Sequence, residues 1–239
     1  WEYFMEQRTF PTGQLNYEQK MEEQYNLLRS QKNTSRSLTT NENWTIVGPT
    51  NSIPAGGGAG RLNCITVDPN DAQSIWVGSP SGGLWHSNNG GATWTTNTDL
   101  LPILGVSFIA IDPTNSQVMY ISTGDGDAGN TNSIGLMKSI DGGATWFLTG
   151  MNNAVYGYGL TRKILINPSN TSNILVCTDN AIYKTTDAGT TWTQVIQSNF
   201  FDLRFKVGNS NTVFAASTTN IFTSIDFGST WNMDSIGLP

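Results

Sequence analysis

The chain has 239 residues, enough for one large all-β domain or two smaller domains with a sizeable buried core. Only 13% of the residues are charged, whereas there are 25 glycines and 8 tryptophans, and this balance excludes disorder, a coiled coil and long solvated helices. The net charge of −6 excludes the cationic surface that nucleic-acid binding or adhesion to anionic lipid needs. No apolar run approaches the roughly 18 residues of a membrane helix, so we expect no membrane insertion.

The first 43 residues follow a different pattern from the rest. Every glutamate lies at or before Glu42, whereas nearly all glycines come after it. Between Asn16 and Lys32, apolar residues recur at steps of three and four, which predicts one amphipathic helix. Such a helix usually packs on its own domain, and recognition of a partner is the alternative. We therefore predict an N-terminal segment with a helix and a linker over residues 1–43, followed by a repeat domain over residues 44–239.

An eight-residue motif occurs four times in the repeat domain. It reads Ser/Thr-x-Asp/Asn-x-Gly-x-Thr-Trp, and we call the copies box 1 (87–94), box 2 (139–146), box 3 (185–192) and box 4 (224–231). The boxes recur about every 40 to 50 residues, an interval typical of propeller blades. Three β-rich runs precede each box and its Trp begins a fourth, so each repeat predicts a four-stranded blade.

The residue types of the box indicate a tight turn. The Ser or Thr and the Asp or Asn can accept hydrogen bonds from nearby backbone N–H groups, and the Gly permits a positive φ. The Trp is expected to fill the space between neighbouring sheets. Because the carboxylates hold the turn, we expect neither catalysis nor metal binding from them, and no cofactor. The positions assigned to structure are Ser87, Asn89, Gly91, Trp94, Ser139, Asp141, Gly143, Trp146, Thr185, Asp187, Gly189, Trp192, Ser224, Asp226, Gly228 and Trp231.

The predicted fold is all-β: a β-propeller of four-stranded blades with a short N-terminal helical segment. Trp44 stands about one repeat before the first box Trp, so it is expected to open an outer strand of another blade. Gly237–Pro239 is similar to Leu100–Pro102, which connects two of the blades. Both features predict that the four blades are a fragment of a larger ring.

The boxes resemble the Asp boxes, or bacterial neuraminidase repeats, of a β-propeller family, and the resemblance covers about Trp44 to Trp231. The family includes sialidases, xyloglucanase-type glycosidases, sortilin-type receptors and photosystem assembly factors, so the motif is specific for fold and not for function. Trp44–Pro49, Gly60–Leu62 and Val77–Trp85 are also similar to large secreted proteins of Bacteroidetes, many of which carry a type IX secretion sorting domain. The resemblance implies a secreted or cell-surface bacterial protein, with components of a secretion or surface complex among its partners.

The loops at the rim opposite the boxes contain the candidate ligand-binding residues. The loop Gly124–Asn130 is longer than its equivalents, and the connector Gly150–Lys163 combines aromatic side chains with a cation, which suits sugars or peptides. Solvated loops with packed tyrosines are the alternative. The candidates are Arg61, Asp125, Asp127, Tyr156, Tyr158 and Arg162.

Other motifs in the repeat domain lack the structural context that their function would need. Gly124-x-Gly126-x-x-Gly129 matches a dinucleotide fingerprint but opens no helix, and the same loop lacks the later ligands of a calcium site. His86, the only histidine, is expected at the surface. Cys64 and Cys177 could form one disulfide or remain two buried thiols.

Interpretation of the repeat domain as a glycosidase or a sialidase requires catalytic residues that the sequence does not have at the expected positions. Glycosidases generally use two carboxylates, and the repeat domain has no glutamate. Where xyloglucanase-type enzymes would align their nucleophilic Asp, this chain has Pro80 and Ser81. Sialidases use three arginines, but Arg204 lies within a predicted strand and the Phe-Arg-Ile-Pro motif is absent. We therefore expect no catalytic residues and a module that binds polysaccharide or protein. The alternatives are a glycoside hydrolase whose carboxylates lie in other blades, and a passive scaffold.

Overall fold

The computed structural model describes residues 60–99, 101–126, 131–152 and 160–234, together with Asn26. Asn26 belongs to the predicted N-terminal helix and is helical and exposed. The remainder of that helix, the linker, Trp44 and the predicted C-terminal connector lie outside the described residues.

The chain divides into two compact units, and the blades belong to the second. The first unit comprises Trp1–Ala59 and Leu100–Pro102, and the second comprises Gly60–Asp99 and Ile103–Pro239. Within the described ranges, no helix has the length and apolar character needed to cross a bilayer.

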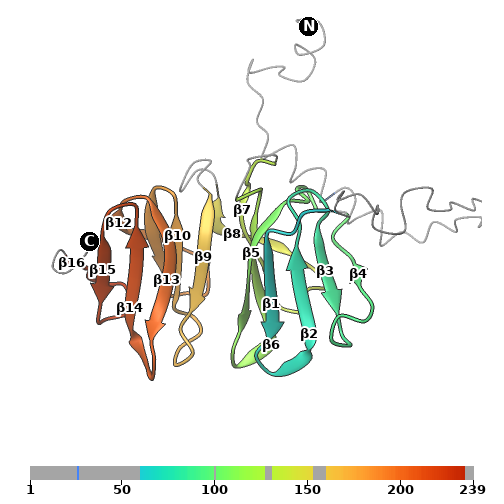
Figure 1. The fold of residues 1–239 in the computed structure, drawn as a ribbon, viewed down its shortest axis with the longest axis horizontal. Helices are drawn as coiled ribbons and strands as arrows, with labels where there is room; N and C mark the ends of the chain where they lie inside the picture. Colours follow the sequence, from blue (N-terminus) through green and yellow to red (C-terminus); the bar gives the residue numbers. More distant parts are fainter. Residues whose placement is uncertain (1–25, 27–59, 100, 127–130, 153–159, 235–239) are drawn as a thin grey trace, which may run out of the picture. The chain divides into compact units, whose positions relative to one another are not determined.

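The second unit contains four antiparallel sheets, each built from four strands in sequence order (Figure 1). Each sheet corresponds to one predicted repeat, so the predicted all-β architecture of four-stranded blades is confirmed. The strands are, in blade 1, β1 (Cys64–Asp68), β2 (Asp71–Gly78), β3 (Leu84–Ser87) and β4 (Thr95–Thr96); in blade 2, β5 (Val106–Asp112), β6 (Asn115–Thr123), β7 (Gly135–Ser139) and β8 (Phe147–Asn152); in blade 3, β9 (Thr161–Ile166), β10 (Ile174–Thr178), β11 (Ala181–Thr185) and β12 (Thr193–Gln197); in blade 4, β13 (Phe200–Lys206), β14 (Asn209–Ser217), β15 (Ile221–Ser224) and β16 (Asn232–Asp234).

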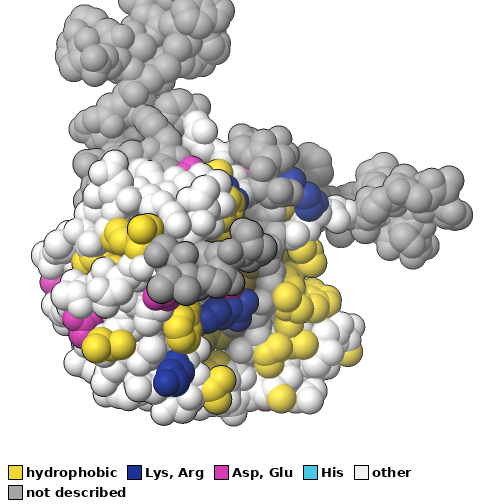
Figure 2. Space-filling view, turned by 60° about the vertical axis from the view of Figure 1, so that its left-hand side comes forward, with side chains coloured by type: hydrophobic (Ala, Val, Ile, Leu, Met, Phe, Trp, Pro, Cys, Tyr) yellow, Lys and Arg dark blue, Asp and Glu magenta, His cyan; other side chains and the backbone are white. Residues whose placement is uncertain are grey.

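The first strands of the blades are neighbours. β1 contacts β5, β5 contacts β9, and β9 contacts β13, so the four inner strands lie next to one another (Figure 1). A hollow of about 480 Å³ is lined mainly by apolar residues of these inner strands, with Lys163 among them. Figure 2 shows a face of the molecule on which Lys and Arg side chains lie next to hydrophobic ones. The propeller therefore places the starts of neighbouring inner strands close together.

A seam joins each blade to the next at one position of the second strand. Trp76, Tyr120 and Leu175 occupy this position, since each pairs with the equivalent residue of its third strand. Each packs against the glycine of the following box, namely Gly143, Gly189 and Gly228, so closely that a Cβ there would lie within 2.6 to 3.5 Å of the side chain. The seam residues are 0 to 6% exposed, so the box of one blade covers the sheet of the blade before it.

Each box forms the turn that its residue types predict. In box 2, Ser139 accepts from the N–H of Gly143 (2.8 Å), and Asp141 accepts from the N–H of Thr145 (2.8 Å) and from its hydroxyl (2.6 Å). The residue before the glycine also has a positive φ, even where it is Ala188 (56°) or Phe227 (49°). Sequence reasoning missed this second left-handed position, because two of its four occupants are not glycine.

The box tryptophans are not equally buried. Trp146 is 2% exposed, as expected for a side chain between sheets, but Trp94 is 38% exposed. The expectation that every box Trp fills an inter-sheet space is therefore wrong for box 1. The physical reason is that no described sheet precedes blade 1 to cover its box.

Candidate functional site

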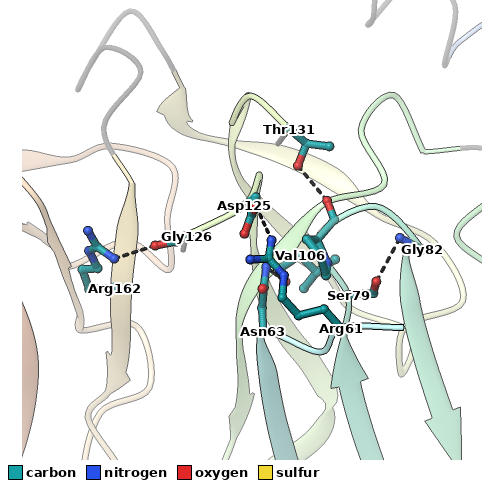
Figure 3. A network of polar contacts seen from close by, with 10 residues as sticks. Arg61, Asn63, Ser79, Gly82, Val106, Asp125, Gly126, Thr131 and Arg162 are labelled. Atoms are coloured by element: carbon teal, nitrogen blue, oxygen red, sulfur yellow. Dashed lines mark hydrogen bonds and ion pairs between the residues drawn. The ribbon is translucent and has the colours of Figure 1, made fainter. Parts of the chain in front are cut away.

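The candidate site lies where chain segments from three blades meet at one end of the inner strands (Figure 3). Arg61 lies in the segment before β1, Asp125 lies in the loop between β6 and β7, and Arg162 lies near the start of β9. In each antiparallel blade, the start of the first strand and the loop between the second and third strands lie at the same end of the sheet. The blade topology therefore brings together three of the six candidate residues; Asp127, Tyr156 and Tyr158 lie outside the described residues.

Arg61 and Asp125 form an ion pair between blades 1 and 2. The Arg61 Nη2 atom bonds the Asp125 Oδ2 atom, and Figure 3 shows the two side chains pointing toward each other. The Asp125 side chain is fully buried, and that of Arg61 is 36% exposed. A buried carboxylate is costly unless a counter-charge and hydrogen bonds compensate for its lost hydration. The pair therefore fixes the loop between β6 and β7 against the first blade.

A second set of hydrogen bonds holds the same loop. The Asp125 N–H donates to the Thr131 carbonyl (3.0 Å), and the Thr131 hydroxyl donates to the Pro80 carbonyl of blade 1 (2.8 Å). The hydroxyl of Ser107 donates to that of Ser122 (3.0 Å) on the neighbouring strand. These bonds place the loop so that the Gly126 carbonyl faces blade 3.

Arg162 reaches from blade 3 toward this loop. Its Nη1 atom donates a hydrogen bond to the Gly126 carbonyl (Figure 3), and its Cζ atom lies 5.9 Å from the ring centroid of Phe201 in blade 4. Its Nε atom is buried and has no hydrogen-bond partner among the described residues, and the same holds for the Thr161 hydroxyl. Buried polar groups are satisfied in the large majority of cases. The site thus contains two buried groups with unused hydrogen-bonding capacity.

A hollow of about 320 Å³ opens between these segments. Its volume falls at the lower end of the range typical of ligand pockets, roughly 300 to 1,000 Å³. The hydroxyl, amide and guanidinium groups that it contains can bond to the hydroxyl groups of a ligand. The lining residues are Leu62, Asn63, Ser107, Gly126, Thr161 and Arg162.

Sequence reasoning missed four polar or aromatic residues of this region: Asn63, Ser107, Thr161 and Phe201. Asn63 donates from Nδ2 to the Val106 carbonyl (3.3 Å), which places it across the hollow from blade 3. These residues lie in or next to inner strands, where alternation alone does not distinguish a lining residue from a core residue. Their place in the sequence could have identified them, since all four lie near the start of an inner strand.

His86, Cys64 and Cys177 lie in packed surroundings that fit a structural role. His86 stacks on Trp76, with ring centroids 3.9 Å apart, and its Nε2 atom hydrogen bonds the Ser74 hydroxyl (3.0 Å). Burial lowers the pKa of His86. Cys64 and Cys177 are free thiols, and burial raises the pKa of each to about 12, which makes both poor nucleophiles. Among the described residues, no group of three or more His, Cys, Asp or Glu is placed to hold a metal ion.

Comparisons with known proteins identify sequences and structures that are similar to this chain. No family model matches the chain. A xyloglucanase of Hypocrea jecorina is 26% identical over 211 residues, which cover 82% of this chain and 23% of that protein. Among solved structures, an ancestral GH74 enzyme is similar with a TM-score of 0.63 at 20% identity, over 77% of this chain and 24% of that chain.

A second solved structure broadens the comparison. YCF48 bound to a D1 peptide is similar with a TM-score of 0.53 at 19% identity, over 75% of this chain and 54% of that chain. This chain therefore spans about a quarter of the length of the xyloglucanase and about half that of YCF48. These likenesses support the β-propeller fold.

Proposed function

We propose that the chain is an extracellular β-propeller module that binds a polysaccharide in the hollow between blades 1, 2 and 3. The observation that carries the proposal is a pair of buried groups, the Arg162 Nε atom and the Thr161 hydroxyl, that have no partner in the described part of the chain and lie at a polar hollow of about 320 Å³. Ligand hydroxyl groups would satisfy both. The similarity to xyloglucanases favours a polysaccharide over a protein as ligand.

The location of the protein follows from the same ligand class. Structural polysaccharides of the kind that a xyloglucanase acts on lie outside cells, so a module that binds them must be secreted or displayed at the surface. The similarity of Trp44–Pro49, Gly60–Leu62 and Val77–Trp85 to secreted proteins of Bacteroidetes, many of which carry a type IX sorting domain, supports this proposal. A protein ligand or a surface complex is the alternative partner, supported by the similarity to YCF48 bound to a peptide.

A glycoside hydrolase is the second candidate, supported by the names of the relatives and by Asp125, a buried carboxylate beside the hollow. Hydrolysis needs two carboxyl groups, about 5 Å or roughly 6.5 to 9.5 Å apart, flanking the scissile bond. Asp125 is held in an ion pair with Arg61, and among the described residues no carboxylate lines the hollow itself. These residues therefore fit binding better than hydrolysis.

Calorimetric titration of the full chain with xyloglucan and other cell-wall polysaccharides tests the proposal. The matched variant is Thr161→Val, which keeps the shape and removes a hydroxyl that has no partner within the described chain. We expect an unchanged melting temperature and affinity lowered about fivefold, as for loss of one neutral hydrogen bond.

Two results would contradict the proposal: no binding to any polysaccharide, or equal affinity of Thr161→Val and the parent chain. Release of reducing sugar by the parent chain, abolished in a folded Asp125→Asn variant, would establish the hydrolase instead.

A further inference from the structure

Arg162 differs from the other described arginines in its charge environment. Arg61 is paired with Asp125, and the Arg204 Nε atom lies 2.7 Å from Asp202 Oδ2. Within residues 60–99, 101–126, 131–152 and 160–234, no salt bridge joins Arg162 to a carboxylate. Within the same residues, its guanidinium has one neutral acceptor, the Gly126 carbonyl, and its Nε atom has none.

An uncompensated, partly buried guanidinium favours an anionic partner. Charge-assisted hydrogen bonds are about twice as strong as neutral ones, and the planar fork of an arginine matches the two oxygens of a carboxylate. A neutral hydroxyl could satisfy the Nε–H but would leave the charge uncompensated. The site therefore favours a ligand that carries a carboxylate.

An aromatic surface lies beside the same guanidinium. Phe201 is 49% exposed, and its ring centroid lies 5.9 Å from the Arg162 Cζ atom. An exposed ring of this kind offers a flat apolar face to the C–H groups of a sugar ring. The hollow that Arg162 lines also contains the hydroxyl groups of Ser107 and Thr161. A guanidinium with both a flat ring and hydroxyl groups near it suits an acidic sugar better than an acidic side chain of a peptide.

We propose that Arg162 and Phe201 bind an acidic saccharide, a uronic acid unit whose carboxylate bonds the Arg162 guanidinium while its ring lies on Phe201. The inference rests on the proposed binding function and names the ligand class of that site. It adds a charge requirement that a neutral polysaccharide would not meet.

The test compares two ligands of the same length and different charge. The full chain is titrated calorimetrically with oligogalacturonic acid and with the same oligomer after methyl esterification, which removes the charge and keeps the sugar rings. We expect the acid to bind about tenfold tighter or more, and the difference to shrink as salt is raised. Arg162→Gln is expected to lose this preference, Arg162→Lys to keep part of it, and Phe201→Ala to weaken binding of both forms.

Arg204→Gln is the matched control. It removes the same charge from neighbouring β13, where Arg204 is 70% exposed and lies outside the hollow. Its affinity should equal that of the parent chain, and the melting temperature of every variant shows that it is folded. Arg162→Gln could fail to fold. In that case the acid and the ester are compared on the parent chain and on Phe201→Ala, whose side chain is half exposed, and this comparison still tests whether the site prefers an acidic saccharide.

The outcomes separate the two proposals. Equal binding of acid and ester, or a preference that survives Arg162→Gln, overturns the acidic saccharide and leaves polysaccharide binding intact. Equal losses in Arg162→Gln and Arg204→Gln overturn it as well, since they indicate attraction by net charge alone. Tight binding of oligoglutamate that depends on Arg162 overturns the saccharide in favour of an acidic peptide. No binding of any glycan overturns both proposals.

Discussion

The closed seams between blades and the outer positions of the described arc have the same local structure and different burial. At the seams, Trp76, Tyr120 and Leu175 are 0 to 6% exposed, whereas Phe214 at the equivalent position of blade 4 is 38% exposed. Trp146 in box 2 is 2% exposed, whereas Trp94 in box 1 is 38% exposed. The repeated motif therefore forms its turn in every blade, but its residues are buried only where another sheet packs against them.

The turns themselves are nearly identical in the two settings. Gly91 and Gly143 each donate their N–H to the first residue of the box at 2.8 Å. The N–H of Thr93 donates to the Asn89 side chain at 2.9 Å, much as Thr145 donates to Asp141 in box 2. Formation of the box therefore depends on local hydrogen bonds, and the stability that it adds depends on its neighbour.

The largest expected effect that separates the two settings comes from removing a tryptophan. Trp146→Ala should lower the free energy of unfolding by about 3 to 5 kcal/mol, because it leaves a cavity between two sheets. Trp94→Ala should cost no more than about 2 kcal/mol, because its side chain is already partly hydrated. Urea denaturation of both variants measures the difference, and equal losses would contradict the distinction between closed and open boxes.

An intermediate effect is expected from a methyl group at the box glycine. Gly143 and Gly91 have φ of 83° and 91°, so alanine at either position costs about 1 to 2 kcal/mol of backbone strain. At Gly143 the new Cβ would also lie 2.7 Å from Trp76 Cη2, whereas at Gly91 it would meet only the ring of Trp94 at 3.6 Å. Gly143→Ala should therefore lose about 1 to 3 kcal/mol more than Gly91→Ala. Similar denaturation midpoints for the two variants would show that the seam yields without cost.

The fold was predictable because its signals are local and repeated. The box residues determine a turn within eight positions, and the same pattern of strands precedes each copy, so the four-stranded blades could be predicted without knowing any contact between blades. The burial of Trp94 was predicted wrongly because burial depends on which sheet covers the box, and one repeat does not contain that information.

The candidate site was only partly predictable, because it is assembled from three blades. Charge near the loops predicts Arg61, Asp125 and Arg162 as candidates, but the pairing of Arg61 with Asp125 joins two blades across a sequence separation of 64 residues. Thr161 and Ser107 were missed because each reads as an ordinary strand residue. What distinguishes Thr161 is a hydroxyl without a partner among the residues that the structure describes, a property of the packed structure.

The smallest expected effect concerns the charge of the box carboxylate. Hydrogen bonds from the side chain and the N–H of Thr191 lower the pKa of Asp187 from 3.8 to about 2. Because the folded pKa lies below the unfolded value, the stability from the ionised carboxylate is fully present above about pH 4 and is lost as the pH falls through 2. Box 1 carries Asn89 at this place and does not titrate there, although it forms the same turn.

Asp187→Asn converts box 3 to the chemistry of box 1. We expect a small loss of stability near neutral pH, because the amide oxygen can still accept the N–H of Thr191, and a shallower fall in unfolding free energy between pH 4 and pH 2. Asp226, whose folded pKa is also about 2, preserves part of the slope. Denaturation across this pH range measures both quantities. An unchanged slope would mean that the carboxylate is not what makes box 3 sensitive to acid. A loss at neutral pH as large as that of Trp146→Ala would mean that the local turn, and not the seam, supplies most of the stability.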